Sequence, residues 1–422
     1  MITSEERALL AALLKAAWAA APENIKARIQ PLLDAAHEQL RVFLDTGQPP
    51  HDPNIPHQLL LVKSFLTDDQ DGFLKRLDAQ TALAAKVTVS PGGEIWGTGK
   101  YQQLDPFWVG AFAEWAGHLI FGKHKFPSGT PSIITMPSQI TIALAGDFGT
   151  GNFGIDPAPS KKIAGHINSL KPDYTIHLGD VYYAGTNGEE VKNFVNDWPK
   201  GARGSFAMNS NHEMYSGGKP YFQIAVGGEV FHLQSPYSFF ALENSDWIVV
   251  GLDSAYYADE HSLYMDGSLG SNAQSTFLQS LAQKGKKVIV LTHHNGLPEN
   301  GSVPSGGSAP TKLWAEVMSA FQGSPLPVCW YWGHVHAGVV YKPQPNGLLC
   351  RCTGHAALPW GLASELENNP NVIWFERSNA GDPSDPARVL NGFVLLKLDG
   401  SSLSETFYNE NGGVAWPANP AN

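Results

Sequence analysis

The chain has 422 residues, of which 43% are hydrophobic, and a formal net charge of -11 at pH 7. This length predicts two or three domains with a sizeable core. The negative charge argues against a nucleic-acid-binding protein, which needs basic surface to displace counterions. It does not exclude a small anionic substrate, because a bound metal ion can dominate the local field. Three cysteines are too few for a disulfide framework, and we expect them to be buried thiols.

The first third of the chain has the pattern of helices. We expect helices over 4–20, 23–46, 55–67 and 70–86, and a further helix in the aromatic-rich segment "YQQLDPFWVGAFAEWAGHLIFG". The amino-terminal segment differs from a signal peptide because Glu5 and Glu6 occupy the place of the basic region and Lys15 interrupts the apolar run. Thr3 or Ser4 is the expected cap of the first helix. No stretch has the length of a membrane span, so the sequence predicts a cytoplasmic protein with no membrane partner.

From residue 139 the pattern changes to short β-branched runs separated by turns and helical stretches. The expected strands lie over 140–147, 174–180, 205–213, 247–254, 287–294 and 328–336, and the expected helices over 157–170, 189–197 and 272–284. A hairpin is expected to close the chain. Alternating strands and helices predict sheet layers covered by helices, with the chemistry at the carboxyl ends of the strands. The Gly-, Pro- and Ser-rich segment 295–311 predicts a substrate-facing loop.

Polar side chains end five of the six expected strands. The blocks are Gly146-Asp147-Phe148-Gly149, Gly179-Asp180-Val181-Tyr182-Tyr183, Asn211-His212-Glu213, Val290-Leu291-Thr292-His293 and Gly333-His334-Val335-His336. Each block alone is a weak signal. Together they bring carboxylate, amide and imidazole donors to one sheet edge, which is enough for two metal ions that share a carboxylate.

These five blocks, in this order, resemble the metallophosphoesterase (calcineurin-like) superfamily and, within it, the purple acid phosphatase branch, with its G-D-x-G, G-D-x-x-Y, G-N-H-[ED], V-x-x-H and G-H-x-H motifs. The resemblance implies an α/β (α+β) fold: a four-layer αββα metallophosphatase sandwich, here preceded by an all-helical N-terminal domain. The expected divisions are a helical domain over 1–125, a linker over 126–138, the catalytic domain over 139–410 and a tail over 411–422.

The resemblance also implies the metal ligands. Metal A would be bound by Asp147, Asp180, Tyr183 and His336, and metal B by Asp180, Asn211, His293 and His334, with Asp180 bridging. Most of the superfamily has a histidine where this chain has Gly149, and Tyr183 is the expected substitute. Two carboxylates and a phenolate suit Fe³⁺ at site A, whereas two imidazoles and an amide suit Fe²⁺, Zn²⁺ or Mn²⁺ at site B.

The implied reaction is hydrolysis of a phosphate ester by a metal-bound hydroxide, with Asp180 in the centre and His212 contacting the phosphate and assisting the leaving group. His294, His355 and His261 are softer candidates for substrate contacts. Ser210 stands where the family has glycine, and it would be strained if that position required a positive φ.

Several alternatives remain open. The stretch "GTGNFG" spells the G-x-G-x-x-G of dinucleotide sites, but the "IDPAP" that follows separates it from the next helix. A phosphodiesterase-specific member of the superfamily, or a non-catalytic metal-loaded scaffold for phosphate-bearing partners, would carry the same motifs. The expected partner is a small phosphorylated substrate and no nucleic acid, and the helical N-terminal domain is a candidate surface for homo-oligomer formation.

Overall fold

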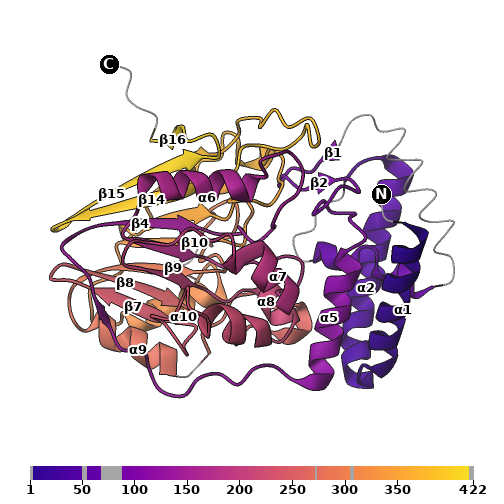
Figure 1. The fold of residues 1–422 in the computed structure, drawn as a ribbon, viewed down its shortest axis with the longest axis horizontal. Coiled ribbons are helices and arrows are strands. Elements are labelled where there is room, and N and C mark those ends of the chain that lie inside the picture. Colours follow the sequence, from indigo (N-terminus) through magenta and orange to yellow (C-terminus); the bar gives the residue numbers. More distant parts are fainter. Residues whose placement is uncertain (1–2, 50–54, 68–87, 271–272, 305–307, 418–422) are drawn as a thin grey trace.

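Two β-sheets stacked face to face form the centre of the molecule (Figure 1). The computed structural model describes residues 3–49, 55–67, 88–270, 273–304 and 308–417. The first sheet has eight strands in the order β13 (Val372–Phe375), β11 (Gly338–Tyr341), β12 (Leu349–Thr353), β10 (Cys329–Trp332), β9 (Lys287–Thr292), β8 (Trp247–Leu252), β7 (Phe240–Glu243) and β3 (Ile134–Thr135). The second has six strands in the order β16 (Val414–Trp416), β15 (Ser402–Asn409), β14 (Gly392–Asp399), β4 (Gln139–Ala145), β5 (Tyr174–His177) and β6 (Gly204–Ala207).

The strands that precede the polar motifs are parallel within each sheet. In the six-stranded sheet β4 pairs with β5 and β5 with β6 in parallel, and in the eight-stranded sheet β8, β9, β10 and β12 are parallel neighbours. Their carboxyl ends therefore meet at one edge of the sandwich. Backbone contacts join the two edges there, because the Gly146 N–H donates to the Thr353 carbonyl at 3.0 Å.

Alternating side chains of these strands are buried on both faces of each sheet. In β9, Ile289 and Leu291 point into the core between the sheets, whereas Val288 and Val290 join the core under the helices. A strand with two buried faces has to be apolar throughout, which is why these strands read as continuous apolar runs in the sequence.

Helices cover both outer faces of the sandwich. α6 (Pro159–Leu170) lies against the six-stranded sheet, and α9 (Ala273–Ala282) and α10 (Lys312–Ala320) lie on the opposite side of the molecule (Figure 1). This arrangement confirms the predicted four-layer α/β sandwich. The three cysteines are free and buried, as predicted.

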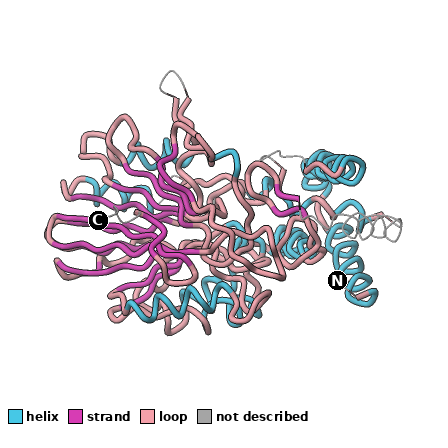
Figure 2. The backbone as a smooth tube through the Cα atoms, turned by 90° about the horizontal axis from the view of Figure 1, so that it is seen from above, coloured by secondary structure: helices cyan, strands magenta, loops and turns pink. Residues whose placement is uncertain are grey.

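The N-terminal region stands beside the sandwich as a group of helices (Figures 1 and 2). It contains α1 (Ser4–Ala20), α2 (Glu23–Thr46), a short 3₁₀ turn η1 (His57–Leu59), α3 (Val62–Leu66) and α5 (Trp108–Phe121). Thr3 caps α1 as predicted and accepts a hydrogen bond from the Glu6 N–H. The expected helix over 70–86 lies outside the described residues. The region also contains a hairpin of β1 (Thr88–Val89) and β2 (Ile95–Trp96), where no strand was expected from the sequence pattern.

None of the helices within the described residues is both long and apolar enough to cross a membrane.

Candidate metal centre and its pocket

The carboxyl ends of β4, β5, β6, β9 and β10 bring the predicted ligands into one cluster. The cluster contains Asp147, Asp180, Asn211, His293, His334 and His336, all of them buried or nearly so. The His334 N–H donates to Asp147 Oδ2 at 3.0 Å, and this bond ties the end of β10 to the end of β4. The five motifs thus converge although up to 189 positions separate them in the sequence.

The two carboxylate oxygens of Asp180 face two different groups of donors. Oδ2 lies 2.9 Å from the Tyr182 hydroxyl and 4.0 Å from His336 Nε2, on the side where Asp147 lies. Oδ1 lies 3.3 Å from His293 Nε2. Asp180 therefore occupies the centre of the cluster, with one oxygen directed to each side.

The donors around Oδ1 form the second group. His293 Nε2 lies 2.9 Å from Asn211 Oδ1 and 3.2 Å from His334 Nδ1. His293 Nδ1 donates to the Leu178 carbonyl at 2.8 Å, which leaves the Nε2 lone pair directed into the cluster. A ring nitrogen fixed in this way by a carbonyl is typical of a metal-binding histidine.

Burial and charge show that this cluster fits cations. Burial and the adjacent Asp180 carboxylate raise the pKa of Asp147 well above its usual range, as expected for two buried carboxyl groups side by side. Burial lowers the pKa of His334 to about 3 and lowers the pKa of His336 well below its usual range. Neutral imidazoles beside a carboxylate pair are the donors that two metal ions require.

The structure places Tyr182, and not the predicted Tyr183, at the carboxylates. The Tyr182 hydroxyl donates toward Asp147 Oδ1 at 3.0 Å and lies 3.3 Å from His336 Nε2. The Tyr183 hydroxyl instead donates to Asp105 Oδ2 at 2.5 Å, and its ring packs against Trp108 of α5 at 4.8 Å. Tyr183 points away because the N-terminal region supplies both the acceptor for its hydroxyl and the surface for its ring.

Gly149 leaves no room for the superfamily's histidine. Its N–H donates to the Asp180 carbonyl at 3.0 Å, and its carbonyl accepts from the Tyr182 N–H at 2.9 Å. A Cβ at this position would lie 2.5 Å from both the Asp180 carbonyl oxygen and Val181 Cα. The close backbone contact requires glycine and fixes the segment that carries Tyr182.

His212 lies beside the cluster at the start of the short helix α8 (Asn211–Tyr215). Its Nδ1 lies 2.7 Å from the Tyr183 carbonyl, which accepts the Nδ1 proton, and its Nε2 lies 3.8 Å from Asp180 Oδ2. Ser210 has a φ of -137°, an extended conformation that serine adopts without strain, and its hydroxyl caps α8. The same hydroxyl contacts Asp180 Oδ1 and Glu213 Oε2, so it also holds the central carboxylate in place.

The three softer candidates do not line the pocket over the cluster. Both ring nitrogens of His294 are engaged, Nδ1 with the Ser254 hydroxyl at 2.9 Å and Nε2 with the Tyr264 carbonyl at 2.7 Å. His355 is buried against the backbone of Gly338 and Gly392. His261 lies in the turn η4 (Glu260–Ser262), next to Asp259. None of these three side chains is therefore positioned to contact a substrate in this pocket.

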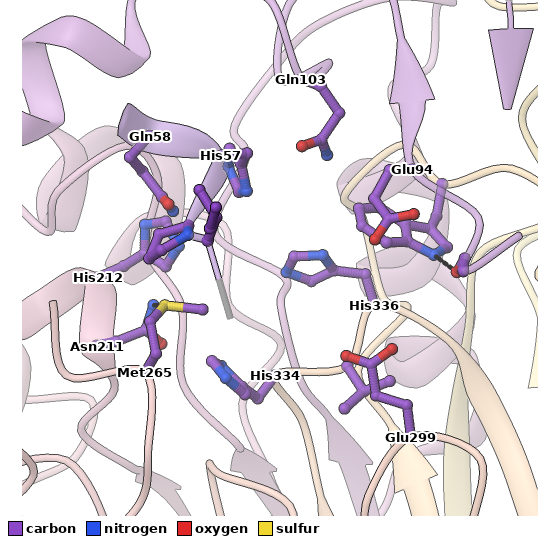
Figure 3. Close-up of a pocket in the computed structure, with 15 residues that line it drawn as sticks. His57, Gln58, Glu94, Gln103, Asn211, His212, Met265, Glu299, His334 and His336 are labelled. Atoms are coloured by element: carbon purple, nitrogen blue, oxygen red, sulfur yellow. Dashed lines mark hydrogen bonds between the residues drawn. The ribbon is translucent and has the colours of Figure 1, made fainter. Parts of the chain in front are cut away.

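The pocket is lined by both parts of the molecule (Figure 3). The sandwich contributes Asn211, His212, Met265, Glu299, His334, Val335, His336 and Trp360, and the N-terminal region contributes Ile55, Pro56, His57, Gln58, Gly92, Glu94 and Gln103. Glu299 belongs to the predicted substrate-facing loop. Sequence reasoning missed the N-terminal contributors because no motif precedes residue 139 to mark them.

The dinucleotide alternative fails on the same geometry. α6 begins at Pro159, five positions beyond Gly154, so its N-terminus does not follow the glycine-rich loop directly. Asp147 also points into the cluster from the turn where a pyrophosphate would have to bind.

Comparison with family models agrees with this geometry. Residues 140–338 match the family model of the calcineurin-like phosphoesterases. A search of curated proteins found no match. Among solved structures, the chain is similar to GAP50, the anchor in the inner membrane complex of Plasmodium, at 14% identity, 66% coverage of this chain, 87% of that chain and a TM-score of 0.45. It is similar to a dimetal phosphatase from Danio rerio at 10% identity, 64% and 98% coverage and a TM-score of 0.37.

The family match spans the five polar strand ends from Asp147 to His336. Two groups of side chains within this span could each hold a metal ion: Asp147, Asp180 and His336 form one, and His293, His294 and His334 form the other. Residues 140–338 are therefore a calcineurin-like phosphoesterase domain, the domain of metal-dependent phosphoesterases.

Proposed function

We propose that the protein hydrolyses phosphate esters with a dinuclear centre of the purple acid phosphatase type, in which Asp180 bridges two metal ions. The observation that carries the proposal is the central position of Asp180, whose Oδ2 faces Tyr182 and His336 while its Oδ1 faces His293. A carboxylate with two differently partnered oxygens is the arrangement that a shared ligand requires.

Site A would be held by Asp147, Asp180, Tyr182 and His336. Tyr182 replaces Tyr183 in this set because its hydroxyl, 3.0 Å from Asp147 Oδ1, is the one that reaches the carboxylates. Two carboxylates and a phenolate form a hard anionic set that favours Fe³⁺.

Site B would be held by Asp180, Asn211, His293 and His334. Its imidazoles and neutral amide favour a divalent ion, Fe²⁺, Zn²⁺ or Mn²⁺. The Leu178 carbonyl fixes the tautomer of His293 in the form that presents Nε2.

When bound, the two ions supply a water of lowered pKa and neutralise the charge that grows on the phosphoryl oxygens. His212 supplies a proton to the departing alkoxide. The Tyr183 carbonyl holds its Nδ1 proton at 2.7 Å, so the ring is oriented and Nε2 is the atom that carries the transferable proton. Asn211 and His334 also line the pocket, so in this proposal the phosphoryl group binds between the metal ligands and His212.

The substrate is a small phosphorylated molecule in this proposal, and the protein works in the cytoplasm. We also propose that identical chains associate through the N-terminal helices. The molar mass of the protein in solution would test this association.

The test combines metal analysis with hydrolysis of p-nitrophenyl phosphate by protein loaded with iron and a divalent metal. The wild type should bind two ions per chain and release nitrophenolate. Asp180→Asn should lose both the metal binding and the hydrolysis, because the substitution weakens the ligand that the two ions share. Asp399→Asn, an exposed change at the far end of β14, should retain both. Two bound ions without turnover between pH 4 and 9 would contradict an enzymatic role and favour a metal-loaded scaffold.

A further inference from the structure

Gln58 carries a buried amide that the fold does not use. The side chain is 1% exposed, and neither its Oε1 nor its Nε2 has a hydrogen-bond partner among the described residues. Most buried polar side-chain atoms in folded proteins have such a partner, because burial removes their hydrogen bonds to water. An unpaired buried amide therefore requires an explanation outside the packing of the chain itself.

Two other buried glutamines show the usual structural role of this side chain. Gln234 is also 1% exposed, and its Oε1 accepts from the Ala207 N–H at 2.7 Å while its Nε2 donates to the Ala207 carbonyl at 2.8 Å. The Oε1 of Gln274 accepts from the Asp253 N–H at 3.0 Å, and its Nε2 donates to the Asp253 carbonyl at 2.8 Å. Both amides bind backbone groups, whereas within the described part of the chain the amide of Gln58 binds none.

The fold places Gln58 in the pocket beside His212. Both side chains line this pocket, and Figure 3 shows the Gln58 amide directed into it. The neighbouring His57 packs edge to face on Trp108 with 4.5 Å between the ring centroids, and the Trp108 centroid lies 5.8 Å from that of His212. Trp108 therefore holds η1, which carries Gln58, next to the proposed proton donor.

His57 and Gln58 make this side of the pocket a neutral, hydrogen-bonding surface. Burial, and after it the nearby His212, lowers the pKa of His57 to about 3, so the ring is uncharged near pH 7. The Gln58 amide offers N–H donors and a carbonyl acceptor side by side. A ligand group that pairs with both has to accept and donate a hydrogen bond at once.

The chemistry of these unpaired atoms favours a hydroxyl group over the phosphoryl group. An ionised phosphoryl oxygen only accepts, so it would pair with Nε2 and leave Oε1 unpaired. A hydroxyl group pairs with both atoms. The pocket has a volume of about 110 Å³, and a benzene ring fits an engineered protein cavity of about 150 Å³. The part of the substrate inside the pocket is therefore a phosphoryl group with a few carbon atoms.

We infer that the substrate is the phosphate ester of a small polyol and that Gln58 binds a hydroxyl group of its leaving alcohol. The inference rests on the proposed function. The Nε2–H donates to the hydroxyl oxygen, and Oε1 accepts the hydroxyl proton. Water forms the new P–O bond, the P–O bond to the polyol breaks, and the departing oxygen takes a proton from His212, which the proton released by the water replaces. The products are inorganic phosphate and the free polyol.

The experiment compares two esters that differ only in their hydroxyl groups. Glycerol 1-phosphate is a polyol ester, and n-propyl phosphate has the same carbon chain without free hydroxyl groups. We expect the metal-loaded wild type to favour glycerol 1-phosphate by about 100-fold in kcat/KM for phosphate release, because the propyl ester leaves the amide unpaired. Gln58→Met, which keeps the side-chain length and removes both polar atoms, should lower this preference by at least about tenfold. Gln223→Met, the same change at an exposed position outside the pocket, should retain it.

A second readout needs no substrate. Gln58→Met should leave the urea midpoint of unfolding unchanged or raise it, because the amide has no partner to lose among the described residues. Gln234→Met removes a paired amide at equal burial and should lower the midpoint. An equal drop in both variants would assign Gln58 a structural role and overturn the inference.

The outcomes separate the two proposals. If neither of these esters nor p-nitrophenyl phosphate is hydrolysed, the proposed function itself fails. If p-nitrophenyl phosphate is hydrolysed but glycerol 1-phosphate has no advantage over propyl phosphate, only the inference fails. An advantage that survives Gln58→Met would place the recognition of the hydroxyl group elsewhere and also overturn the inference.

Discussion

At the scale of single residues, only one of two adjacent tyrosines has its phenol hydroxyl at the candidate metal centre. Motif spacing selects Tyr183, but its hydroxyl donates to Asp105, which lies 78 positions earlier. Tyr182 takes the place at the carboxylates, 2.9 Å from Asp180 Oδ2. A sequence motif specifies the spacing of residues at one strand end. It contains no information about a hydrogen-bond acceptor in another part of the chain.

The pair of tyrosines gives a matched test. In protein loaded with Fe³⁺, a phenolate ligand should produce a visible absorption band, and Tyr182→Phe should abolish it. Tyr183→Phe should keep the band, because its hydroxyl lies on Asp105 and not at the centre. Both variants remove one buried hydroxyl, so each is the control for the other. Loss of the band in Tyr183→Phe with retention in Tyr182→Phe would restore the assignment that the motif predicts.

At the scale of elements, α5 of the N-terminal region packs against the segments that carry Tyr183 and His212. Trp108, which is 1% exposed, has its ring centroid 4.8 Å from that of Tyr183 and 5.8 Å from that of His212. Its Nε1–H donates to the Gln102 carbonyl at 2.8 Å. The N-terminal region thus packs against the site through α5 and lines its pocket through residues 55–58 and 92–103.

Trp108→Ala should therefore impair both stability and catalysis. Removing a buried indole costs about 3–5 kcal/mol of unfolding free energy, and the loosened His212 should lower kcat by about tenfold. Trp247→Ala is the control, because Trp247 is 2% exposed but starts β8 at the end of the sheet away from the cluster. Urea unfolding and p-nitrophenyl phosphate kinetics measure the two effects. Equal kcat values for the two variants would show that α5 has no positioning role.

The strands and their polar ends could be predicted at the same scale, because burial and ligand chemistry impose patterns on neighbouring residues. The strands predicted over 140–147 and 287–294 correspond to β4 and β9; Asp147 lies two positions after the end of β4, and His293 directly follows β9. The pocket wall could not be predicted, because Gln58, Glu94 and Glu299 depend on how the N-terminal region docks. Contacts of that kind leave no periodic trace in the sequence.

At the scale of the whole molecule, burial keeps several histidines outside the metal cluster uncharged. Burial lowers the pKa of His118 to about 4 and the pKa values of His177 and His355 to about 3. His177 lies among Phe194, Trp198 and Phe148, and neither of its ring nitrogens has a hydrogen-bond partner within the described part of the chain. Each such histidine makes folding less favourable in acid.

His177 gives the sharpest form of this prediction. Its folded pKa of about 3 lies below the value of 6.5 for a free histidine, so the unfolded chain takes up a proton that the folded protein does not. Its contribution to stability is complete above pH 6.5 and is lost as the pH falls toward 3. Between pH 7.5 and pH 5 the loss should be about 2 kcal/mol for this residue alone. His177→Phe, which puts an uncharged ring in the same aromatic surroundings, should reduce the pH dependence of the unfolding free energy by that amount. His232→Gln, on the exposed surface, should keep the wild-type dependence. Urea unfolding of the three proteins at both pH values measures the difference, and equal slopes for His177→Phe and the wild type would show that His177 is not the group that titrates.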